Sequence, residues 1–341
     1  VGLKKIDSIA TLATTEGMMP GAQILVARKG KVIYNKTFGH HTQNKIKTVS
    51  QTDVYDIASL TKIMATLPLV MQLVDKGVLT MDTTLSELLP QYKQTDKANI
   101  TLRRMLTHTA RLKSWIPYYV NTMDSLTNKP KTKWYKPTYS QEFPYKVASK
   151  MFLKREYKDS IYRFIRESEL RETQEYKYSD LPYYLLMKYL EGYYDLPLEE
   201  LVQQNFYASI GAYSMCYNPL DRYNKNNIVP TEEDTYFRMQ KIHGYVHDQG
   251  AAMLGGVSGH AGLFSTANDV AKMMQLFLNG GSYGGQKYLS SEVISDFNTC
   301  YYCDQNVRRG VGFDKPQLED SGPTCGCVSM SSFGHSGFTG T

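Results

Sequence analysis

The 341-residue chain contains no long hydrophobic run, no long tract of one charge and only five cysteines. Its apolar runs are far shorter than the roughly 20 residues that a membrane-spanning helix needs, and we recognise no signal peptide. No long Ser/Gly/Pro-rich stretch indicates a disordered region. No glycine-rich phosphate loop or dinucleotide fingerprint follows an expected strand, so nucleotide chemistry has no support. The formal net charge of +6 suits an anionic substrate or envelope polymer as well as nucleic acid, and decides nothing alone.

The few cysteines leave their chemical state open. Four of them form a C-x-x-C and a C-x-C pair, which permits a zinc site or disulfides. Ordinary loop thiols or one disulfide are favoured over zinc, because C-x-C matches common zinc sites poorly. The odd count leaves at least one cysteine without a partner in the chain. The five residues are Cys216, Cys300, Cys303, Cys325 and Cys327.

The sequence contains enough apolar residues for one large core, or for two lobes that share one cleft. Two strands at 22–28 and 32–38 flank Lys29-Gly-Lys31 as a hairpin, and the small residues of 332–341 are typical of a closely approached strand. Residues 114–158 read as irregular. The hydrophobic periodicity predicts helices over 3–16, 60–74, 85–89, 102–108, 159–170, 181–193, 197–209 and 268–279.

This order of elements predicts one catalytic domain made of two lobes. Strands from both chain ends (1–55 and 280–341) would form one sheet, with a mostly helical lobe at 56–279. A sheet that ended at Thr341 would leave an exposed edge, so we expect further residues beyond it. The chain starts at Val1 rather than methionine, which leads us to expect a removed upstream segment and would suit fusion to an upstream domain.

Ser59 and Lys62 form the single S-x-x-K tetrapeptide of the sequence, at the start of the helix predicted over 60–74. Positions i and i+3 share one helix face, so the Lys62 ammonium can reach the Ser59 hydroxyl. A serine at a helix N-terminus also places its own backbone N–H beside negative charge developing at a reacting carbon. The spacing therefore indicates a nucleophile, an activating cation and half of an oxyanion hole. Alone it is weak evidence, because a chain of this length should hold about one such tetrapeptide by chance.

Four stretches spread over nearly the whole chain strengthen this hypothesis. They are 57–66 (IASLTKIMAT), 106–109 (LTHT), 255–265 (GGVSGHAGLFS) and 333–340 (FGHSGFTG). With them the chain resembles the active-site-serine, penicillin-recognising hydrolases, in the branch of class C β-lactamases, D-alanyl-D-alanine carboxypeptidases and esterases. The resemblance implies an α+β, β-lactamase/transpeptidase-like fold, in which an antiparallel sheet flanked by helices adjoins a mostly helical lobe. It also implies an enzyme without a cofactor or a metal.

The family has a second motif based on Tyr or Ser. Tyr178-Ser179-Asp180 is preferred here, because it directly precedes an apolar helix that would fix it on the cleft wall. Tyr119-Val-Asn121 is the rival, and it matches the family's Y-x-N better in its third residue. Tyr-x-Asp also occurs at Tyr157, Tyr193 and Tyr302.

The family's third motif is K/H-x-G. His335-Ser336-Gly337 is preferred for its position near the chain end, over the rival His260-Ala-Gly262. His260 is expected instead to stabilise a glycine-rich loop, and His108 to have a structural role. His247 and Asp248 could contact substrate, although a structural role is slightly favoured.

The resemblance assigns roles to these residues. Ser59 would form an acyl-enzyme, Lys62 and Tyr178 would share the proton transfers, and the N–H groups of Ser59 and Phe338 would hold the oxyanion. The substrate-binding residues would be Asp180, His335, Ser336 and Gly337. Many members have lysine where this chain has His335, and asparagine where it has Asp180, so an esterase or peptidase is favoured over an efficient β-lactamase.

These observations leave three alternative hypotheses for the function. The first is a serine hydrolase of the bacterial envelope, periplasmic or otherwise extracytoplasmic, acting on ester, D-amino-acid amide or lactam bonds of a small or peptidoglycan-like acyl substrate. The second is a penicillin-binding sensor or accessory module that is acylated without turnover. The third is a non-catalytic module that binds polymers through the basic, aromatic stretch 129–158, although a solvated insertion is favoured there. No nucleic-acid partner and no transmembrane segment are expected.

Overall fold

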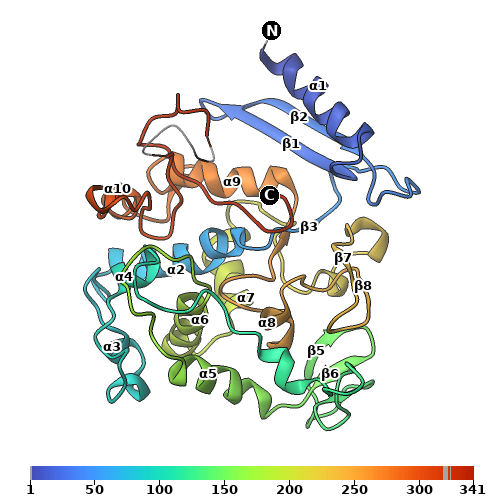
Figure 1. The fold of residues 1–341 in the computed structure, drawn as a ribbon. Helices are drawn as coiled ribbons and strands as arrows, with labels where there is room; N and C mark the ends of the chain where they lie inside the picture. Colours follow the sequence, from blue (N-terminus) through green and yellow to red (C-terminus); the bar gives the residue numbers. More distant parts are fainter. Residues whose placement is uncertain (1, 318–321, 323) are drawn as a thin grey trace.

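A hairpin held between two helices forms one side of the molecule in the computed structural model, which describes residues 2–317, 322 and 324–341 (Figure 1). Strands β1 (Gly21–Arg28) and β2 (Lys31–Gly39) pair in antiparallel fashion. Helix α1 (Gly2–Thr15) packs against β2, and helix α9 (Ala267–Leu278) packs against β1. The helix predicted over 3–16 and the hairpin are therefore confirmed.

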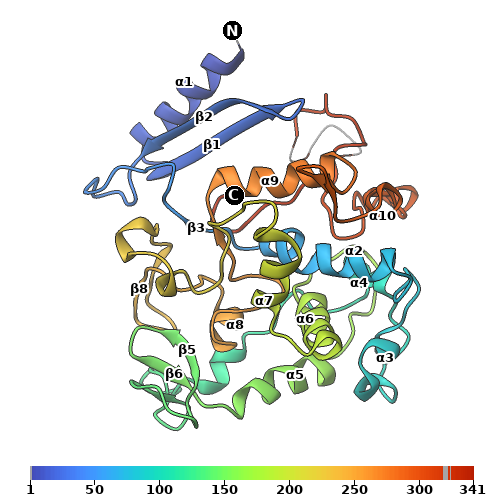
Figure 2. The same ribbon diagram turned by 180° about the vertical axis from the view of Figure 1, so that it is seen from behind.

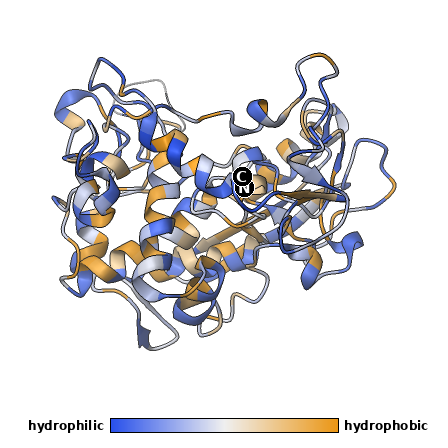
Figure 3. Cartoon of the chain, turned by 90° about the horizontal axis from the view of Figure 1, so that it is seen from below, coloured by the Kyte–Doolittle hydropathy of each residue, from blue (hydrophilic) through white to orange (hydrophobic). Residues whose placement is uncertain are grey.

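The hydrophobic core lies among the remaining helices, seen from behind in Figure 2. Apolar residues of α2 (Leu67–Asp75), α6 (Leu181–Tyr194) and α7 (Leu198–Val202) are almost completely buried there. Helix α5 (Tyr157–Glu167) packs against α6 and turns its apolar face inward. Figure 3, a view from below coloured by hydropathy, shows hydrophobic residues on the helices of the interior and mostly hydrophilic residues on the outer loops.

Short elements connect these layers. Strand β3 (Tyr55–Asp56) pairs with β9 (Phe264–Ser265), and β4 (Tyr135–Lys136), β6 (Met151–Leu153) and β5 (Tyr145–Ala148) form a three-stranded antiparallel sheet in that order. The other strand pairs are β7 (Glu232–Asp234) with β8 (Gln240–Ile242) and β10 (Ser282–Tyr283) with β11 (Gln286–Lys287). The short helices are α3 (Leu85–Leu88), α4 (Leu102–Leu106), α8 (Gln249–Met253) and α10 (Ser291–Asn298). The 3₁₀ turns are Pro90–Tyr92, Tyr118–Thr122, Pro219–Asp221, Lys225–Asn227 and Cys303–Gln305.

The helix predicted over 60–74 is not a uniform α-helix. It begins with a π-helical stretch, Lys62–Thr66, and becomes α2 at Leu67. Pro68 lies just after this junction and has no N–H to donate to the Met64 carbonyl. The Tyr207 hydroxyl donates to that carbonyl instead, at 3.0 Å. Such π-helical turns within helices are frequent at functional sites.

The strand predicted over 332–341 is wrong. This segment makes an isolated bridge between Gly334 and Asp314 and then turns, with the Gly337 N–H donating to the Thr341 carbonyl at 2.7 Å. The Thr339 hydroxyl donates to the Asp56 carbonyl, also at 2.7 Å, so the segment is bonded to the chain just before Ser59 and not to β1. The expected joint sheet of both chain ends is therefore wrong for the described residues, where β1 and β2 pair only with each other. The lobe boundaries (1–55 with 280–341, and 56–279) stay a prediction.

Other differences are local. The stretch 114–158, expected to be irregular, contains the sheet of β4, β5 and β6, whose strands are too short to show a clear alternation. The helix predicted over 197–209 is split into α7 and the π-helical Gln203–Tyr207. Helices α8 and α10 were not predicted. No helix among the described residues is long and apolar enough to cross a bilayer.

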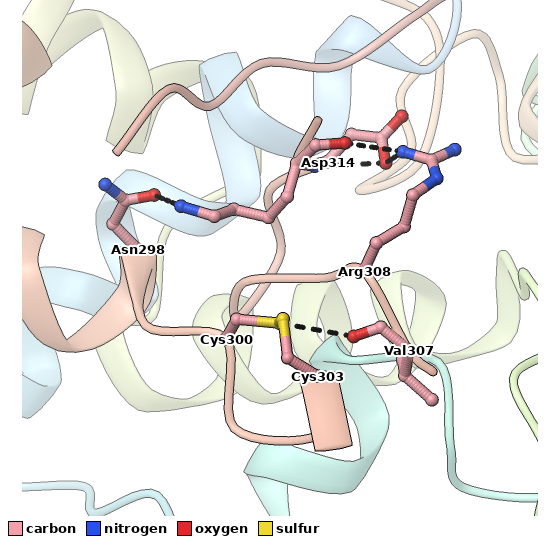
Figure 4. Close-up of a disulfide and its surroundings, with 7 residues drawn as sticks. Asn298, Cys300, Cys303, Val307, Arg308 and Asp314 are labelled. Atoms are coloured by element: carbon pink, nitrogen blue, oxygen red, sulfur yellow. Dashed lines mark hydrogen bonds and ion pairs between the residues drawn. A yellow bond between two sulfur atoms is a disulfide. The ribbon is translucent and has the colours of Figure 1, made fainter. Parts of the chain in front are cut away.

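Each of the two close cysteine pairs predicted from the sequence forms a disulfide. Disulfides join Cys300 to Cys303 (Figure 4) and Cys325 to Cys327, while Cys216 is a buried free thiol. Each disulfide closes a very short loop, so each fixes local conformation and ties no distant segments together. Within the described part of the chain, no group of three or more His, Cys, Asp or Glu residues is arranged to hold a metal ion.

Candidate active site

Ser59 lies on a tight turn between β3 and the π-helical stretch. Ala58, the residue before it, adopts a left-handed conformation with φ of 45°, which is uncommon for a residue other than glycine. The buried Asp56 carboxylate holds this turn, because Oδ1 accepts the Ala58 N–H at 2.8 Å and Oδ2 accepts the His247 N–H at 2.6 Å. Burial raises the pKa of Asp56, and the two backbone donors oppose that rise. Ser59 itself is partly exposed and lines a cavity.

The Lys62 ammonium has a partner for each of its three protons. It donates to Ser59 Oγ at 2.9 Å and to the His260 carbonyl at 3.1 Å, and Asp180 Oδ1 lies 2.7 Å away. Burial of this fully buried side chain would lower the pKa of Lys62, but the Asp180 charge and Tyr178 raise it above its usual value. Lys62 is therefore a fixed cation beside Ser59, and it has no lone pair with which to accept a proton.

Tyr178 is the tyrosine that lies beside this cation. Its ring centre is 5.1 Å from Lys62 Nζ, and its hydroxyl is buried without a hydrogen-bond partner among the described residues. The rival Tyr119 also lines the cavity, but its ring packs against Phe237 with centres 4.9 Å apart. Tyr157 lies elsewhere, with its hydroxyl donating to the Tyr118 carbonyl. Tyr302 stacks under the Arg104 guanidinium, and Tyr193 lies on α6 against Tyr189 and Tyr194.

His108 contacts the segment that carries Tyr178 and helps to hold it in place. Its Nδ1 accepts the Ser179 N–H at 3.1 Å, its carbonyl accepts the Lys177 N–H at 2.9 Å, and its ring lies 4.6 Å from that of Tyr178. Burial, followed by the charges of Arg309 and Lys62, holds the pKa of His108 well below its usual value. A neutral imidazole that accepts a backbone N–H supports the phenol without competing for its proton.

His335 lines the same cavity, with its ring centre 5.9 Å from that of Tyr178. Its Nδ1 lies 2.7 Å from the Ser336 carbonyl, which can only accept, so Nδ1 carries the proton. Nε2 is then an acceptor, and it is buried without a partner among the residues described. Burial, with the nearby Arg309 and Lys62 charges, lowers the pKa of His335 to about 3. The side chain is therefore neutral over the ordinary pH range.

Two residues that line this cavity, Ser59 and Phe338, have backbone N–H groups without a protein acceptor among the described residues. The Phe338 ring is largely exposed and stacks on His247, 4.9 Å between centres. Asp56 ties these segments together, because its side chain holds Ala58 and His247 while its carbonyl accepts from Thr339.

His260 and Asp248 also line this cavity and contact each other. His260 Nε2 lies 2.8 Å from Asp248 Oδ1, and its Nδ1 lies 2.8 Å from Ser258 Oγ. The His260 ring stacks on Tyr184 at 4.3 Å, so its main contacts are structural, as expected of a residue in a glycine-rich loop. Asp248 also caps α8 by accepting the Ala251 N–H at 2.7 Å. Asp248 and His247 both line the cavity, which leaves a substrate contact open to them as well.

The cavity around Ser59 has a volume of about 880 Å³. Of the residues predicted for the site, Ser59, Tyr178, Asp180, His335, Ser336 and Phe338 line it; Lys62 lies behind Ser59, and Gly337 beneath the turn that carries Phe338. Folding also brings to it residues that no motif indicated: Trp115, Tyr176, Glu232, Tyr236, Arg308, Arg309 and Asp314. A larger hollow of about 1150 Å³ lies between β1, α9 and residues 338–341, and neither Ser59 nor Lys62 is among the described residues that line it.

The fold and this cavity define a protein of the β-lactamase/transpeptidase-like class, as the sequence predicted. The model of the Beta-lactamase family matches residues 6–341, so the chain belongs to that family. A protein of Escherichia coli (strain K12) named "Putative D-alanyl-D-alanine carboxypeptidase" is 28% identical over 345 residues, which cover 94% of this chain and 74% of that protein.

Solved structures show the same fold. A penicillin-binding protein homolog from Caulobacter crescentus matches with a TM-score of 0.66 at 16% identity, covering 96% of this chain and 83% of that one. EstCE1, a hydrolase with promiscuous acyltransferase activity, matches with a TM-score of 0.63 at 20% identity, covering 92% and 80%. An octameric penicillin-binding protein homologue from Pyrococcus abyssi also has a TM-score of 0.63 at 18% identity; the match covers 88% of this chain, which spans 60% of that chain's length. The family and these relatives support a hydrolase.

Proposed function

We propose that the chain is a serine hydrolase that acts through an acyl-enzyme on Ser59. The observation that carries the proposal is the 2.9 Å hydrogen bond from the buried Lys62 ammonium to Ser59 Oγ. Lys62 donates in this bond, so the Ser59 proton must go to another acceptor. Tyr178 is the candidate, because Lys62 lies over its ring and stabilises negative charge there.

Acylation would then run as follows. Tyr178 enters this step as the phenolate, and Ser59 Oγ attacks the carbonyl carbon of an ester or amide while its proton passes to the phenolate oxygen. The N–H groups of Ser59 and Phe338 hold the resulting oxyanion; losing one such donor typically costs about 3–4 kcal/mol of barrier. As the intermediate collapses, the bond to the leaving group breaks, and Tyr178 returns the proton to the departing oxygen or nitrogen.

Deacylation would repeat these steps with water. Tyr178 accepts a proton from the water as the water oxygen attacks the acyl carbon, and Ser59 Oγ leaves with that proton. The product acid then departs. Lys62 keeps its proton throughout, so its contribution is electrostatic.

The substrate we propose is an ester or a D-amino-acid amide rather than a β-lactam. His335 is neutral where a lysine would supply a fixed charge, and the Asp180 charge is committed to Lys62. Two similar proteins support this choice, one named a putative D-alanyl-D-alanine carboxypeptidase and the other a hydrolase with promiscuous acyltransferase activity. The same relatives support an extracytoplasmic place in the bacterial envelope and a peptidoglycan-like acyl substrate.

Turnover and intact mass test the proposal together. The protein is incubated with a 4-nitrophenyl ester, a D-alanyl-D-alanine peptide and, separately, a β-lactam. Fast product without a lasting adduct supports the hydrolase, and a persistent adduct would favour the acylated sensor. Neither product nor adduct at substantial excess would favour the polymer-binding module. Ser59→Ala should abolish both signals, and unchanged turnover in that variant would remove the assignment.

A further inference from the structure

The stretch 129–158 holds the whole excess of positive charge in the chain. It contains nine Lys or Arg residues and two Asp or Glu residues, a net charge of +7, so the rest of the chain carries −1 of the total of +6. Eight of the nine cations are lysines. Charge of one sign gathered in one stretch indicates that an anionic partner is attracted to this part of the surface.

The acidic residues of the stretch do not neutralise its cations. Both of them, Glu142 and Glu156, pair with the single ammonium of Lys154, at 3.5 and 3.1 Å. None of the other eight cations forms an ion pair with a residue in the described part of the chain. Seven of these eight are exposed. The stretch therefore presents unpaired positive charge to solvent.

The three-stranded sheet places two of these lysines on one face. Lys136 of β4 and Lys146 of β5 both lie opposite Phe152 of β6, the central strand. Residues opposite each other on neighbouring strands share a face, and both lysines are exposed, so this row faces solvent. The neighbouring row, which contains Tyr135 and Leu153, is buried in the core.

Two exposed side chains with apolar surface accompany these lysines. Tyr139 is 65% exposed, and its ring meets that of Phe152 edge-on with centres 6.2 Å apart. Leu126 is 93% exposed in the loop that leads into β4. Asp124 fixes that loop, because its Oδ1 accepts the Leu126 and Thr127 N–H groups at 3.0 and 2.9 Å. An ordered loop thus holds a leucine in water, and transfer of that side chain into an apolar phase is favourable.

This part of the surface is separate from the catalytic cavity. None of residues 124–158 is among the described residues that line the cavity around Ser59. Strands β5 and β6 lie at the opposite end of the molecule from α1 (Figure 1). The loop of Leu126 follows directly on the 3₁₀ turn Tyr118–Thr122, whose Tyr119 lines that cavity. The loop therefore adjoins the cavity without forming its wall.

We propose that a basic surface, made of the exposed lysines of 129–158 with Leu126 and Tyr139, binds the face of a bilayer that contains anionic lipids. Lysine suits a diffuse layer of lipid headgroups, because it is a point charge that needs no bidentate geometry. Leucine and tyrosine gain from partial insertion among the headgroups, which a soluble polyanion does not offer. The inference goes beyond the proposed function and does not depend on the chemistry at Ser59.

Sedimentation of the protein with vesicles tests the proposal. The vesicles are phosphatidylcholine alone, or phosphatidylcholine with about a third of phosphatidylglycerol. We expect binding to the anionic vesicles that weakens as salt is added, and no binding to the neutral ones. Lys136→Gln with Lys146→Gln should lower the partition coefficient about 25-fold, because each lysine near an anionic surface contributes about fivefold. Leu126→Ala should lower it about tenfold, because less apolar area enters the bilayer.

Matched variants on α1 serve as controls. Lys4→Gln with Lys5→Gln removes two exposed lysines, and Leu12→Ala shortens a leucine that is 57% exposed. Neither should change the partition coefficient. Melting followed by circular dichroism checks that every variant is folded.

Selective loss of binding in the variants of the basic surface supports the proposal, whether or not the protein hydrolyses an ester. Failure of the parent protein to bind anionic vesicles overturns it. Equal loss of binding in the α1 variants also overturns it, because the contact would then not lie on the basic surface. Equal affinity for soluble polygalacturonate, unchanged by Leu126→Ala, overturns it in favour of a general attraction to acidic polymers.

Discussion

Asp180 Oδ1 lies 2.7 Å from Lys62 Nζ, and this ion pair keeps a fully buried ammonium charged beside Ser59. Because burial alone would lower the pKa of Lys62, removal of the carboxylate should let that pKa fall. In Asp180→Asn, the alkaline limb of the kcat/KM profile should therefore move to lower pH. Glu232→Gln removes another cavity carboxylate, one paired with Arg238, and should leave that limb in place. A profile for Asp180→Asn that overlays the parent's would contradict the role given to Lys62.

The two tyrosines of the cavity can be told apart by removing one hydroxyl at a time. Tyr178→Phe should lower kcat by about 10²- to 10⁴-fold, the usual contribution of a positioned acid–base group. Tyr119→Phe should lower it no more than a few fold, because that ring packs on Phe237 away from Lys62. Steady-state rates on one ester decide the matter. The reverse order of effects would mean that Tyr119 belongs to the second motif.

Asp56 is expected to position the nucleophile turn and the oxyanion donors. Its carboxylate accepts two backbone N–H groups, and an asparagine can replace only one of those bonds without placing an amide N–H against a donor. Asp56→Asn should lower kcat at least tenfold while KM changes little. It should also lower the free energy of unfolding by about 1.5–3 kcal/mol, the range for a charged hydrogen bond.

Asp53 supplies a matched control for that experiment. It is an equally buried carboxylate three residues upstream, which accepts the Ser50 N–H and lies 2.7 Å from His41 Nε2. Asp53→Asn should cost comparable stability in denaturant unfolding and leave kcat nearly unchanged. If both variants lose kcat in proportion to stability, Asp56 is only a structural residue.

Gly337 is expected to be irreplaceable because a side chain there would displace the Phe338 N–H. An added Cβ would lie 2.0 Å from Thr341 Oγ1 and 2.8 Å from the Ile57 carbonyl. A shift of about 1 Å at such a site can cost roughly 10²-fold in rate, so Gly337→Ala should reduce kcat by that order. At Gly334 a Cβ would meet nothing within 4 Å, so Gly334→Ala should be nearly silent. Similar rates for the two variants would exclude this part of the oxyanion hole.

His335 should influence acid stability and not the neutral pH profile. Its pKa is lowered to about 3 in the folded state, so the unfolded chain, with histidine near 6.5, binds more protons between these values. Its contribution to stability is therefore complete above about pH 6.5 and is lost as the pH falls toward 3. His335→Gln should show a smaller decrease in melting temperature between pH 6.5 and 4 than the parent does. An equal decrease in both proteins would mean that His335 is protonated while folded.

The site was predictable where local geometry determines it. Ser59 and Lys62 are one helical turn apart, so their contact follows from spacing, and the hairpin follows from two apolar runs around Gly30. The π-helical start of the helix was not predictable in the same way, because Pro68 follows one π-helical stretch while the other, Gln203–Tyr207, forms without a proline.

Contacts that join distant loops could not be predicted. Asp56 and His247 are 191 residues apart, and no periodicity links an aspartate to a backbone N–H in a loop. The Arg308–Asp314 ion pair lies in a segment without regular secondary structure. The composition of such a segment does not determine which way its side chains point. Residues 332–341 have the small side chains of a closely approached strand, but whether such a segment pairs depends on neighbours that only the tertiary structure supplies.

The most direct test is to locate the acyl group. The protein is mixed with a slowly released activated ester, quenched in acid, digested and analysed by peptide mass spectrometry. The account predicts one acyl group, carried by Ser59 in the peptide that contains Ala58-Ser-Leu-Thr-Lys62, and its absence in Ser59→Ala. An acyl group on any other residue, or ester turnover that persists without Ser59, would contradict it.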